Sequence, residues 1–586
     1  MTHTAPNHTP ARPTTPAPTI GRDWWILSVS SAMLLWISGP PLGWWPIAFV
    51  AVIPWLVATL PAVVTRKQYL VLYLAGCVYW ALTLQGLRHA NPLIYPCWIA
   101  LAAYLAVYPI LFVIVLRRTI RWGIPLMTAT PLAWVGMECV RNYMLTGISA
   151  AMLGHTMADV PLMIQIADLG GSYAVSLVIV AVNVAGFTLA HWCFGRRQKV
   201  SIKSLIIDGS VAAGLLVGTL LYGQYRLNQP TEESSTTFAL VGRNEPVEYN
   251  QDQARELELF DAYTRQSIAA VESSAVTVDA VVWPESMFTG TLPWVIGQAD
   301  AEIAQENDLT VEEVQSFIDE RRRAFQFRAG SLQSLLAKSN GTENVKPELI
   351  VGCGVIRYGK QPAFYNGIVH LDRDATVQQW YGKMHLVMFG EYIPLVKSIP
   401  IIRDWIPAGL GLTAGDGTRE FQVGPTKLCP NVCIETAVER VAINHMRQLR
   451  AQSSGAPSGG EGGMPNAIVT VTNDAWFDDS SVVQHHKRCA QFVAIACRRP
   501  VLSAANNGPT VWIDSNGRVV KELQQGGAGS VIARPRIDRR ISLVMTLADW
   551  PARICALLFL GVLIYRPRRA VGTAPDSSAT DTSNGP

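Results

Sequence analysis

The sequence predicts a multi-span α-helical membrane bundle joined to a layered α/β domain, and three observations carry this prediction. Of the 586 residues, 49% are hydrophobic and only 16% are charged, and the mean hydropathy is +0.21. Such values are typical of a protein that lies at least partly in a membrane. Long apolar segments occupy the first 228 residues and one run near the C-terminus, whereas residues 235–540 alternate short β-rich runs with helix-like segments.

The N-terminal part supplies most of the predicted spans. Residues 1–22 are rich in Thr and Pro and are expected to form a disordered tail. The chain then carries no charge from Trp24 to Thr65, which is long enough for two spans with a turn at "SGPPLGWW". Further apolar segments follow at 69–86, 93–116, 123–143, 162–194 and 204–223. We therefore expect seven spans within residues 23–228, and an eighth over residues 550–566.

Basic residues predict the orientation of these spans. If the N-terminus is cytoplasmic, every second loop is basic: Arg66 with Lys67, "RRTIR" at 117–121, "RRQK" at 196–199 and "RPRR" at 566–569. Basic loops mark the cytoplasmic side of a membrane. Both termini, including the tail 567–586, are therefore expected in the cytoplasm, and residues 235–540 on the opposite face.

The domain over residues 235–540 has the pattern of a sandwich. The runs "TTFALVG", "AVVWPE", "ELIVGCGVI", "NGIVHL", "AIVTVT" and "RPVLSA" predict strands. The segment "QARELELFDAYTRQSIAAVE" predicts one of the helices between them. Alternating strands and helices favour a layered α/β fold. The charged, helical residues 299–346 and the Gly- and Ser-rich residues 453–463 are interpreted as insertions.

The composition also argues against several kinds of partner and site. The net charge of +4 is small for this length, and no basic block alternates with aromatic residues, so nucleic acid is not expected as a partner. The ten cysteines show no paired zinc spacing. His485, His486 and Cys489 form a local cluster, but no fourth ligand lies at zinc spacing, so we expect no metal there.

Polar residues at three predicted strand ends point to covalent catalysis. Glu285 follows "VVWP", Lys383 and Glu391 lie in the apolar stretch "YGKMHLVMFGEYIP", and Cys433 stands where a strand gives way to a helix. A thiol at such an elbow is expected to have a lowered pKa, and a carboxylate nearby accepts its proton. The ammonium of Lys383 and the backbone N–H of Ile434 are candidates for holding an oxyanion. A lone cysteine in an apolar run is usually structural, so the prediction depends on all three groups together.

The ordered motifs WPE, YxKxHLVxFGE and CxE resemble the nitrilase superfamily, and more narrowly the apolipoprotein N-acyltransferases. The resemblance extends from about residue 24 to 566 and includes "ECVRNYMLTG" at 138–147, "IQIADLGGSYAVS" at 164–176, "TNDAWF" at 472–477 and "RPVLSAANNG" at 499–508. It implies a nitrilase-type α-β-β-α sandwich that faces the periplasm on a multi-pass bundle in the cell inner membrane.

Carried over by position, the resemblance implies that Cys433 is the nucleophile, Glu285 the general base and Lys383 the cation that stabilises the oxyanion. Five further positions match supporting or substrate-binding residues of that family, some of them near the site or its lid: Glu391, Glu435, Trp283, Tyr392 and Trp476. The apolar arm "IPLVKSIPIIRDWI" after Glu391 is expected to be a mobile lid that meets lipid. The sequence departs from the family's usual pattern at three positions, namely Met388, Ile434 and Ser503.

The resemblance also implies the reaction. Cys433 would take an acyl chain from a phospholipid, and the N-terminal amine of a diacylglyceryl-cysteine on an apolipoprotein would then attack the thioester. A monomer working without metal or diffusible cofactor is expected. Two alternatives stay open: a membrane-tethered amide hydrolase with the same triad, and a catalytically idle lipid-binding scaffold.

Two charged residues, Glu138 and Arg141, lie inside a predicted span, where charges are costly. They are interpreted either as contacts for the lipid headgroup or the lipoprotein N-terminus, or as a structural ion pair.

Overall fold

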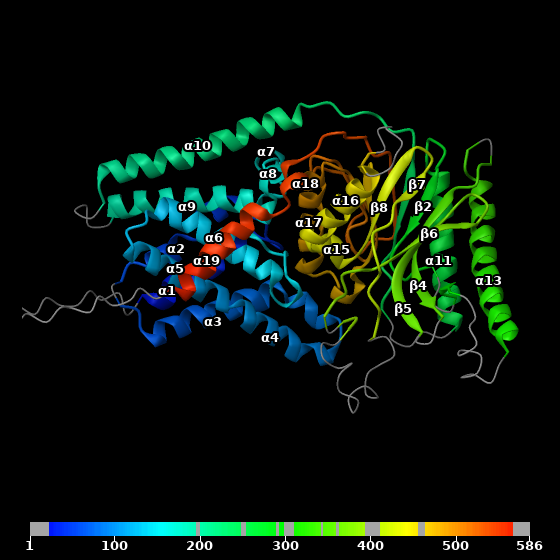
Figure 1. Ribbon diagram of the computed structural model, residues 1–586, viewed down its shortest axis with the longest axis horizontal. Helices are drawn as coiled ribbons and strands as arrows, with labels where there is room; N and C mark the ends of the chain where they lie inside the picture. Colours follow the sequence, from blue (N-terminus) through cyan, green and yellow to red (C-terminus); the bar gives the residue numbers. More distant parts are fainter. Residues whose placement is uncertain are drawn as a thin grey trace, which may run out of the picture.

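The computed structural model describes residues 23–61, 63–194, 200–247, 253–288, 292–297, 310–341, 344–358, 362–388, 390–392, 411–454 and 463–565. It has two parts, a helical bundle and an α/β sandwich, which lie side by side along the longest axis (Figure 1). The last helix, α19, returns from the sandwich to the bundle and packs against α6 (Figure 1).

The bundle is built from apolar helices whose bounds follow local stop signals. For example, Thr65 caps the N-terminus of α3 in a capping box with Gln68. The helices of the bundle are α1 (Trp24–Ser38), α2 (Ile53–Val57), α3 (Arg66–Thr83), α4 (Tyr95–Leu105), α5 (Val107–Arg121), α6 (Leu126–Tyr143), α7 (Pro161–Ile164), α8 (Ala167–Gly170), α9 (Ser172–Phe194), α10 (Ile202–Leu227) and α19 (Trp550–Ile564), with the 3₁₀ helices η1 (Trp45–Phe49) and η5 (Leu153–Met157).

Within the described residues, three helical segments are long and apolar enough to cross a membrane: Tyr95–Arg121, which consists of α4 and α5 together, Ser172–Phe194 and Ile202–Leu227. The apolar helices Trp24–Ser38, Trp45–Val57 and Trp550–Ile564 are shorter. Helix α10 lies along the outside of the bundle (Figure 1) and exposes large apolar side chains such as Leu221, which is 67% exposed. Exposed apolar surface of this kind indicates a membrane partner. The count of eight spans and their orientation stay predictions.

The sandwich contains two sheets packed face to face. The first has the strand order β13-β1-β2-β4-β5-β6, with β3 beside β4, and the second has the order β12-β11-β10-β9-β8-β7. The strands of the first sheet are β1 (Phe238–Gly242), β2 (Ala280–Trp283), β3 (Trp294–Ile296), β4 (Glu348–Arg357), β5 (Ala363–Leu371), β6 (Val377–Gly382) and β13 (Gly529–Ala533). Those of the second are β7 (Phe421–Val423), β8 (Thr426–Val432), β9 (Ala467–Asn473), β10 (Val501–Asn506), β11 (Val511–Ile513) and β12 (Val519–Glu522).

Helices cover the outer face of each sheet, which makes a four-layer α-β-β-α arrangement. One core fills the space between the sheets and includes Leu240, Ile350 and Val469. The first sheet packs outward on α11 (Gln253–Glu272) and α13 (Val311–Ala337). The second packs on α16 (Glu439–Ser454) and α17 (Ser481–Cys497). The buried face of α13 belongs to the same core as the first sheet, so this helix is an integral layer of the domain.

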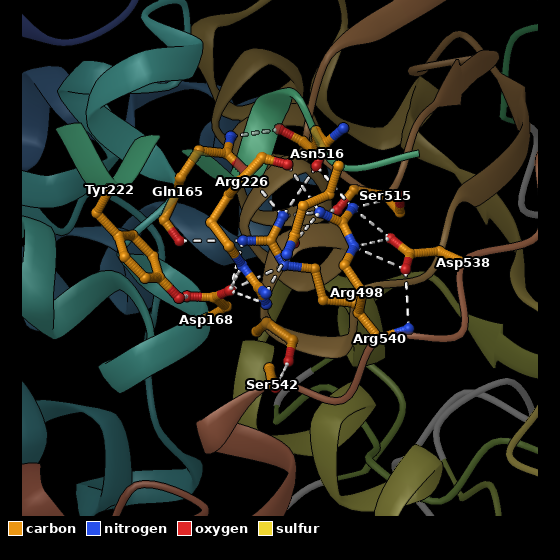
Figure 2. Close-up of polar contacts among 12 residues, drawn as sticks. Gln165, Asp168, Tyr222, Arg226, Arg498, Ser515, Asn516, Asp538, Arg540 and Ser542 are labelled. Carbon is orange, nitrogen blue, oxygen red and sulfur yellow. Dashed lines mark hydrogen bonds and ion pairs between the residues drawn. The ribbon is translucent and has the colours of Figure 1, made fainter. Parts of the chain in front are cut away.

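A buried charge network joins the two parts (Figure 2). Asp168 on α8 pairs with Arg498, which follows α17, at 2.5 Å and with Arg226 on α10 at 2.5 Å. Its other oxygen accepts a hydrogen bond from the Tyr222 hydroxyl at 2.8 Å. Arg498 and Asp168 are both 0% exposed. One buried carboxylate of the bundle therefore binds a buried arginine of the sandwich.

Candidate active site

The carboxyl ends of β2 and β8, one from each sheet, meet at one end of the sandwich. Pro284 stops β2, because it has no N–H for the ladder, and Glu285 comes next. The Glu285 side chain crosses to the second sheet, where one of its oxygens accepts a 2.8 Å hydrogen bond from the backbone N–H of Asn473 at the end of β9. Polar side chains from both sheets are thus brought to one place.

Lys383 follows β6 and is 1% exposed. Its ammonium lies 2.7 Å from a Glu391 oxygen and 3.5 Å from a Glu285 oxygen. Burial alone would lower the pKa of Lys383, but the two carboxylates outweigh burial and raise the pKa. The side chain is therefore a permanent cation held between two acids.

Asn366 on β5 completes this group, and sequence reasoning missed it. Its amide nitrogen donates to Glu285 at 2.5 Å and to Glu391 at 3.0 Å. Burial raises the pKa of Glu285, whereas the Lys383 charge and the Asn366 hydrogen bond oppose that rise. A carboxylate with a raised pKa is suited to accept a proton near neutral pH.

Cys433 stands at the turn between β8 and the short helix α15 (Ile434–Ala437), with φ of 48° and ψ of −112°. A non-glycine residue at such angles is strained. The strand hydrogen bond from Cys433 N–H to the Val471 carbonyl, 2.9 Å, holds it there. The side chain is only partly buried, and both Glu285 and Lys383 lie close enough for their charges to act on the thiol.

The expected lowering of the thiol pKa at this elbow is not observed. Burial raises the pKa of Cys433 well above its ordinary range, Glu285 adds to this, and only then does Lys383 lower it. Helix α15 spans only four residues, so its dipole does little to stabilise a thiolate at its N-terminus. The resting group is therefore a thiol, which needs a base before it can attack.

Glu435 ties the nucleophile's strand to the segment that carries Lys383. It is 0% exposed, and its two oxygens accept hydrogen bonds from the backbone N–H of Met384 at 2.7 Å and of Val432 at 2.8 Å. The Tyr381 hydroxyl donates to it as well, at 2.8 Å. Glu435 thus acts as a brace, which fixes Cys433 relative to Lys383.

A second pair, Asp474 and His486, lies behind the nucleophile. His486 Nδ1 and an Asp474 oxygen are 2.9 Å apart, and the backbone of Cys433 is hydrogen-bonded to the same ring. Burial lowers the pKa of His486, but the Asp474 carboxylate outweighs it and raises the pKa. The sequence signal was "TNDAWF", of which only Trp476 had been singled out.

The remaining predicted site residues lie in varied surroundings. Trp283 is 0% exposed, packs in the core beneath α11 and donates its ring N–H to Ser267 at 2.8 Å, so it is not brought to the cluster. Trp476 is partly exposed in the 3₁₀ helix η8 (Asp474–Phe477). Tyr392 is partly buried and forms a β-bridge with Met388. Ile434 is the first residue of α15, so its N–H has no partner inside that helix.

The predicted lid lies largely outside the described residues. Its apolar arm, residues 393–406, lies within residues 393–410, which the structure does not describe. Ser503, another departure from the family pattern, is buried on β10 within the second sheet.

The histidine and cysteine cluster of α17 is divided among different neighbours. His486 faces Asp474, whereas Cys489 lies 3.9 Å from Nδ1 of His155 in the bundle. The other nitrogen of His155 contacts Glu439 at 2.5 Å. One possible ligand atom from each of His155, Glu439 and Cys489 lies within 4.8 Å of the others. This is a hydrogen-bonded contact between bundle and sandwich.

Comparisons with known proteins cover both parts of the chain. Residues 31–185 match the apolipoprotein N-acyltransferase N-terminal domain, and residues 239–540 match the carbon-nitrogen hydrolase domain. The apolipoprotein N-acyltransferase of Rhodopirellula baltica is 45% identical over 579 residues, which is 93% of this chain and 99% of that protein. Its counterpart from Geobacter metallireducens is 28% identical over 512 residues, 85% of this chain and 87% of that one.

A solved amidase from Nesterenkonia sp. aligns with a TM-score of 0.33 and 12% identity, over 55% of this chain and 97% of the amidase. The family assignment follows from the domain matches and from the full-length relative, and it agrees with the sandwich and bundle described above. The chain therefore belongs to the apolipoprotein N-acyltransferase family and is an enzyme of the acyltransferase class.

Proposed function

We propose that this protein transfers an acyl chain from a phospholipid, through a thioester on Cys433, to the N-terminal amine of a diacylglyceryl-cysteine on lipoproteins. The observation that carries the proposal is the buried Lys383 ammonium between Glu285 and Glu391, beside a thiol on a strained elbow. Nucleophile, base and oxyanion donor are the three parts that acyl transfer requires.

In the first half-reaction, the Cys433 sulfur attacks an ester carbonyl of the phospholipid while Glu285 takes the thiol proton. The tetrahedral oxyanion accepts hydrogen bonds from Lys383 and from the backbone N–H of Ile434. The C–O bond then breaks, and the proton on Glu285 passes to the leaving oxygen. A lysophospholipid departs and a thioester remains.

In the second half-reaction, the acceptor amine attacks the thioester carbonyl, and Glu285 takes a proton from the nitrogen. The oxyanion occupies the same position as before. The C–S bond breaks, the sulfur regains its proton from Glu285, and an amide is released. Glu391 and Asn366 keep Lys383 and Glu285 in place through both steps.

Mass spectrometry of the intact protein incubated with phospholipid tests this proposal. Cys433→Ala is expected to carry no acyl group. Cys429 is buried on β8, the strand that leads to Cys433, and the Cys429→Ala variant should still be acylated. Glu285→Gln should slow acylation by about 10²–10⁴-fold, since the amide cannot take the thiol proton. Glu348→Gln is the control for loss of a carboxylate, because Glu348 pairs with His370 at the far end of β4.

Acylation of the Cys433→Ala variant would overturn the assignment of the nucleophile. If the wild-type acyl group passes to water at the same rate with and without the lipoprotein amine, the protein works as a hydrolase.

We further propose that both termini are cytoplasmic and that the sandwich faces the periplasm, across eight spans. The support is the alternation of basic loops and the apolar, outward-facing surface of α10. A reporter fused after Arg569 is expected to behave as cytoplasmic, and one inserted in residues 453–463 as periplasmic. The same result at both sites would mean that the number of spans is wrong by at least one.

A further inference from the structure

A cavity of about 50 Å³ lies inside the bundle, at its contact with the sandwich, and a few polar side chains stand among its mostly apolar lining. Helices α1, α3, α5 and α6 line it, and two side chains of α17 close one side. Glu285, Lys383 and Cys433 are not among its lining residues. It is therefore a site separate from the proposed catalytic centre.

An arginine without a carboxylate partner faces this cavity. Arg141 on α6 is 5% exposed, and its guanidinium lies over the Trp80 ring at 5.0 Å. Its Nε and Nη2 atoms have no hydrogen-bond partner. Glu138, one turn earlier, accepts a hydrogen bond from the Leu153 N–H at 2.8 Å through one oxygen, while its other oxygen has no partner. Among the described residues no ion pair joins the two, so the structural pair considered from the sequence is not formed.

The other unpartnered polar side-chain atoms of the lining are mostly donors. The ring N–H groups of Trp36 and Trp55 have no partner, and neither ring nitrogen of His485 has one. His485 is 4% exposed, and burial lowers its pKa to about 3, so the neutral ring offers one donor and one acceptor. Unsatisfied donors thus outnumber unsatisfied acceptors around the cavity.

The charged residues of the lining also favour an anion. Arg141 and Arg488 contribute two positive charges against the single carboxylate of Glu138. Asp159 pairs with Arg488 at 2.8 Å, but that carboxylate is 59% exposed. Each buried donor without a partner is unfavourable. Water would satisfy the donors but would give the Arg141 guanidinium no hydrogen-bonded anion, since Glu138 forms no ion pair with it.

We propose that this cavity binds an oxyanion with the chemistry of phosphate, either inorganic phosphate or the phosphodiester of a lipid headgroup. The guanidinium of Arg141 offers the planar pair of N–H donors that suits a phosphate group. A water-sized atom needs about 10–15 Å³ of such space, so the cavity has room for about four, the number of oxygens in phosphate. The surrounding indole and phenol rings exclude bulk water and strengthen the attraction.

The first experiment uses inorganic phosphate as the probe. The full-length protein is purified in a phosphate-free detergent, and its melting temperature is followed against phosphate concentration, with sodium chloride at equal ionic strength as reference. The wild type is expected to show a saturating rise in melting temperature. Arg141→Met should show none. The matched control is Arg553→Met, since Arg553 also lies over aromatic rings but pairs with Asp549 at 2.8 Å and lies outside the cavity.

The second experiment uses lipid. The same variants, each carrying Cys433→Ala to block turnover, are reconstituted in phosphatidylglycerol vesicles, extracted, and analysed by native mass spectrometry for retained phospholipid. Retention that falls with Arg141→Met but not with Arg553→Met identifies a headgroup phosphodiester. A response to inorganic phosphate alone identifies a free anion. If neither measurement depends on Arg141, the cavity holds only water and the proposal is overturned.

Arg141→Lys covers the case in which Arg141→Met does not fold. It keeps the charge and loses the fork of N–H donors, so the phosphate concentration for half-saturation should rise at least about tenfold. An unchanged half-saturation in a folded Arg141→Lys variant would also overturn the proposal.

Discussion

Asn366 is the residue whose removal should change the pH dependence of catalysis most directly. Its amide donates to the charged forms of Glu285 and Glu391, so its loss raises the pKa of Glu285 further above the ordinary range. The reaction needs the deprotonated base, which is lost as pH falls through that pKa. In Asn366→Leu, the acid limb of the pH profile of Cys433 acylation should therefore move up by about one to two pH units, since a hydrogen bond to a charged group is worth about 1.5–3 kcal/mol.

Glu391→Gln should move the same limb in the opposite direction. The negative charge of Glu391 raises the pKa of Glu285, so its removal lowers that pKa. Acylation rates measured by mass spectrometry across a pH series check both variants. Shifts of the same sign in the two variants would show that another group governs the limb.

At the level of single residues, the sequence singled out three side chains that the structure brings close together. Glu285, Lys383 and Cys433 stood out because charges and a thiol are costly in apolar strand ends. Asn366 did not stand out, since its role depends on which strands are neighbours. Trp283 lies away from the cluster because it shares a face of β2 with Val281, and that face packs toward α11.

One strand, β4, is shaped by the need to pass close to the base. A Cβ atom added at Gly352 would lie 2.4 Å from the Pro284 carbonyl oxygen and 2.6 Å from the Cα of Glu285. Gly352→Ala must therefore push Glu285 away from Lys383 and Asn366. Displacements of about 1 Å cost about 10²-fold in rate, and we expect a loss of at least this size in acylation.

Gly354→Ala on the same strand is the matched control. Its added methyl would meet only Pro293 Cβ at 3.7 Å, an ordinary contact, so acylation should stay near the wild-type rate. Equal losses in the two variants would mean that the strand tolerates no alanine and that the effect is not specific to Glu285.

Interior strands and one long helix were predictable as elements. The six apolar runs correspond to β1, β2, β4, β5, β9 and β10, and the segment proposed as a helix is α11. The short strands β3, β7, β11 and β12 were not predicted, because three or four residues carry too little periodicity. Helix α13 falls within residues 299–346, which the sequence predicts as an insertion, because its charged outer face hides the buried stripe that includes Phe325 and Leu332.

For the whole molecule, Asp168 is the most sensitive point of the interface. Asp168→Asn leaves the fully buried Arg498 without its counter-charge, and an unpaired buried charge costs about 3–5 kcal/mol. The melting temperature should fall accordingly. The control Asp159→Asn breaks a partly exposed pair with Arg488, which is worth about 0–1 kcal/mol. Equal melting temperatures for the two variants would contradict a dominant role for Asp168.

At this scale the sequence predicted two parts and their order along the chain, but not how they join. The interface depends on Arg498, Asp168 and Arg226, which are far apart in sequence and look like ordinary charged residues one at a time. The count of spans depends on short apolar helices such as Trp24–Ser38, whose lengths composition alone does not fix.

The sharing of Asp168 has a consequence for the order of assembly during synthesis. Its partner Arg226 lies within the first 227 residues, whereas Arg498 is synthesised only with the sandwich. Within the bundle, Tyr222 and Arg226 contact both oxygens of Asp168, so Arg498 joins a carboxylate that the bundle itself positions. Helix α19 is made last and packs against α6, which closes the chain around a joint that is already in place.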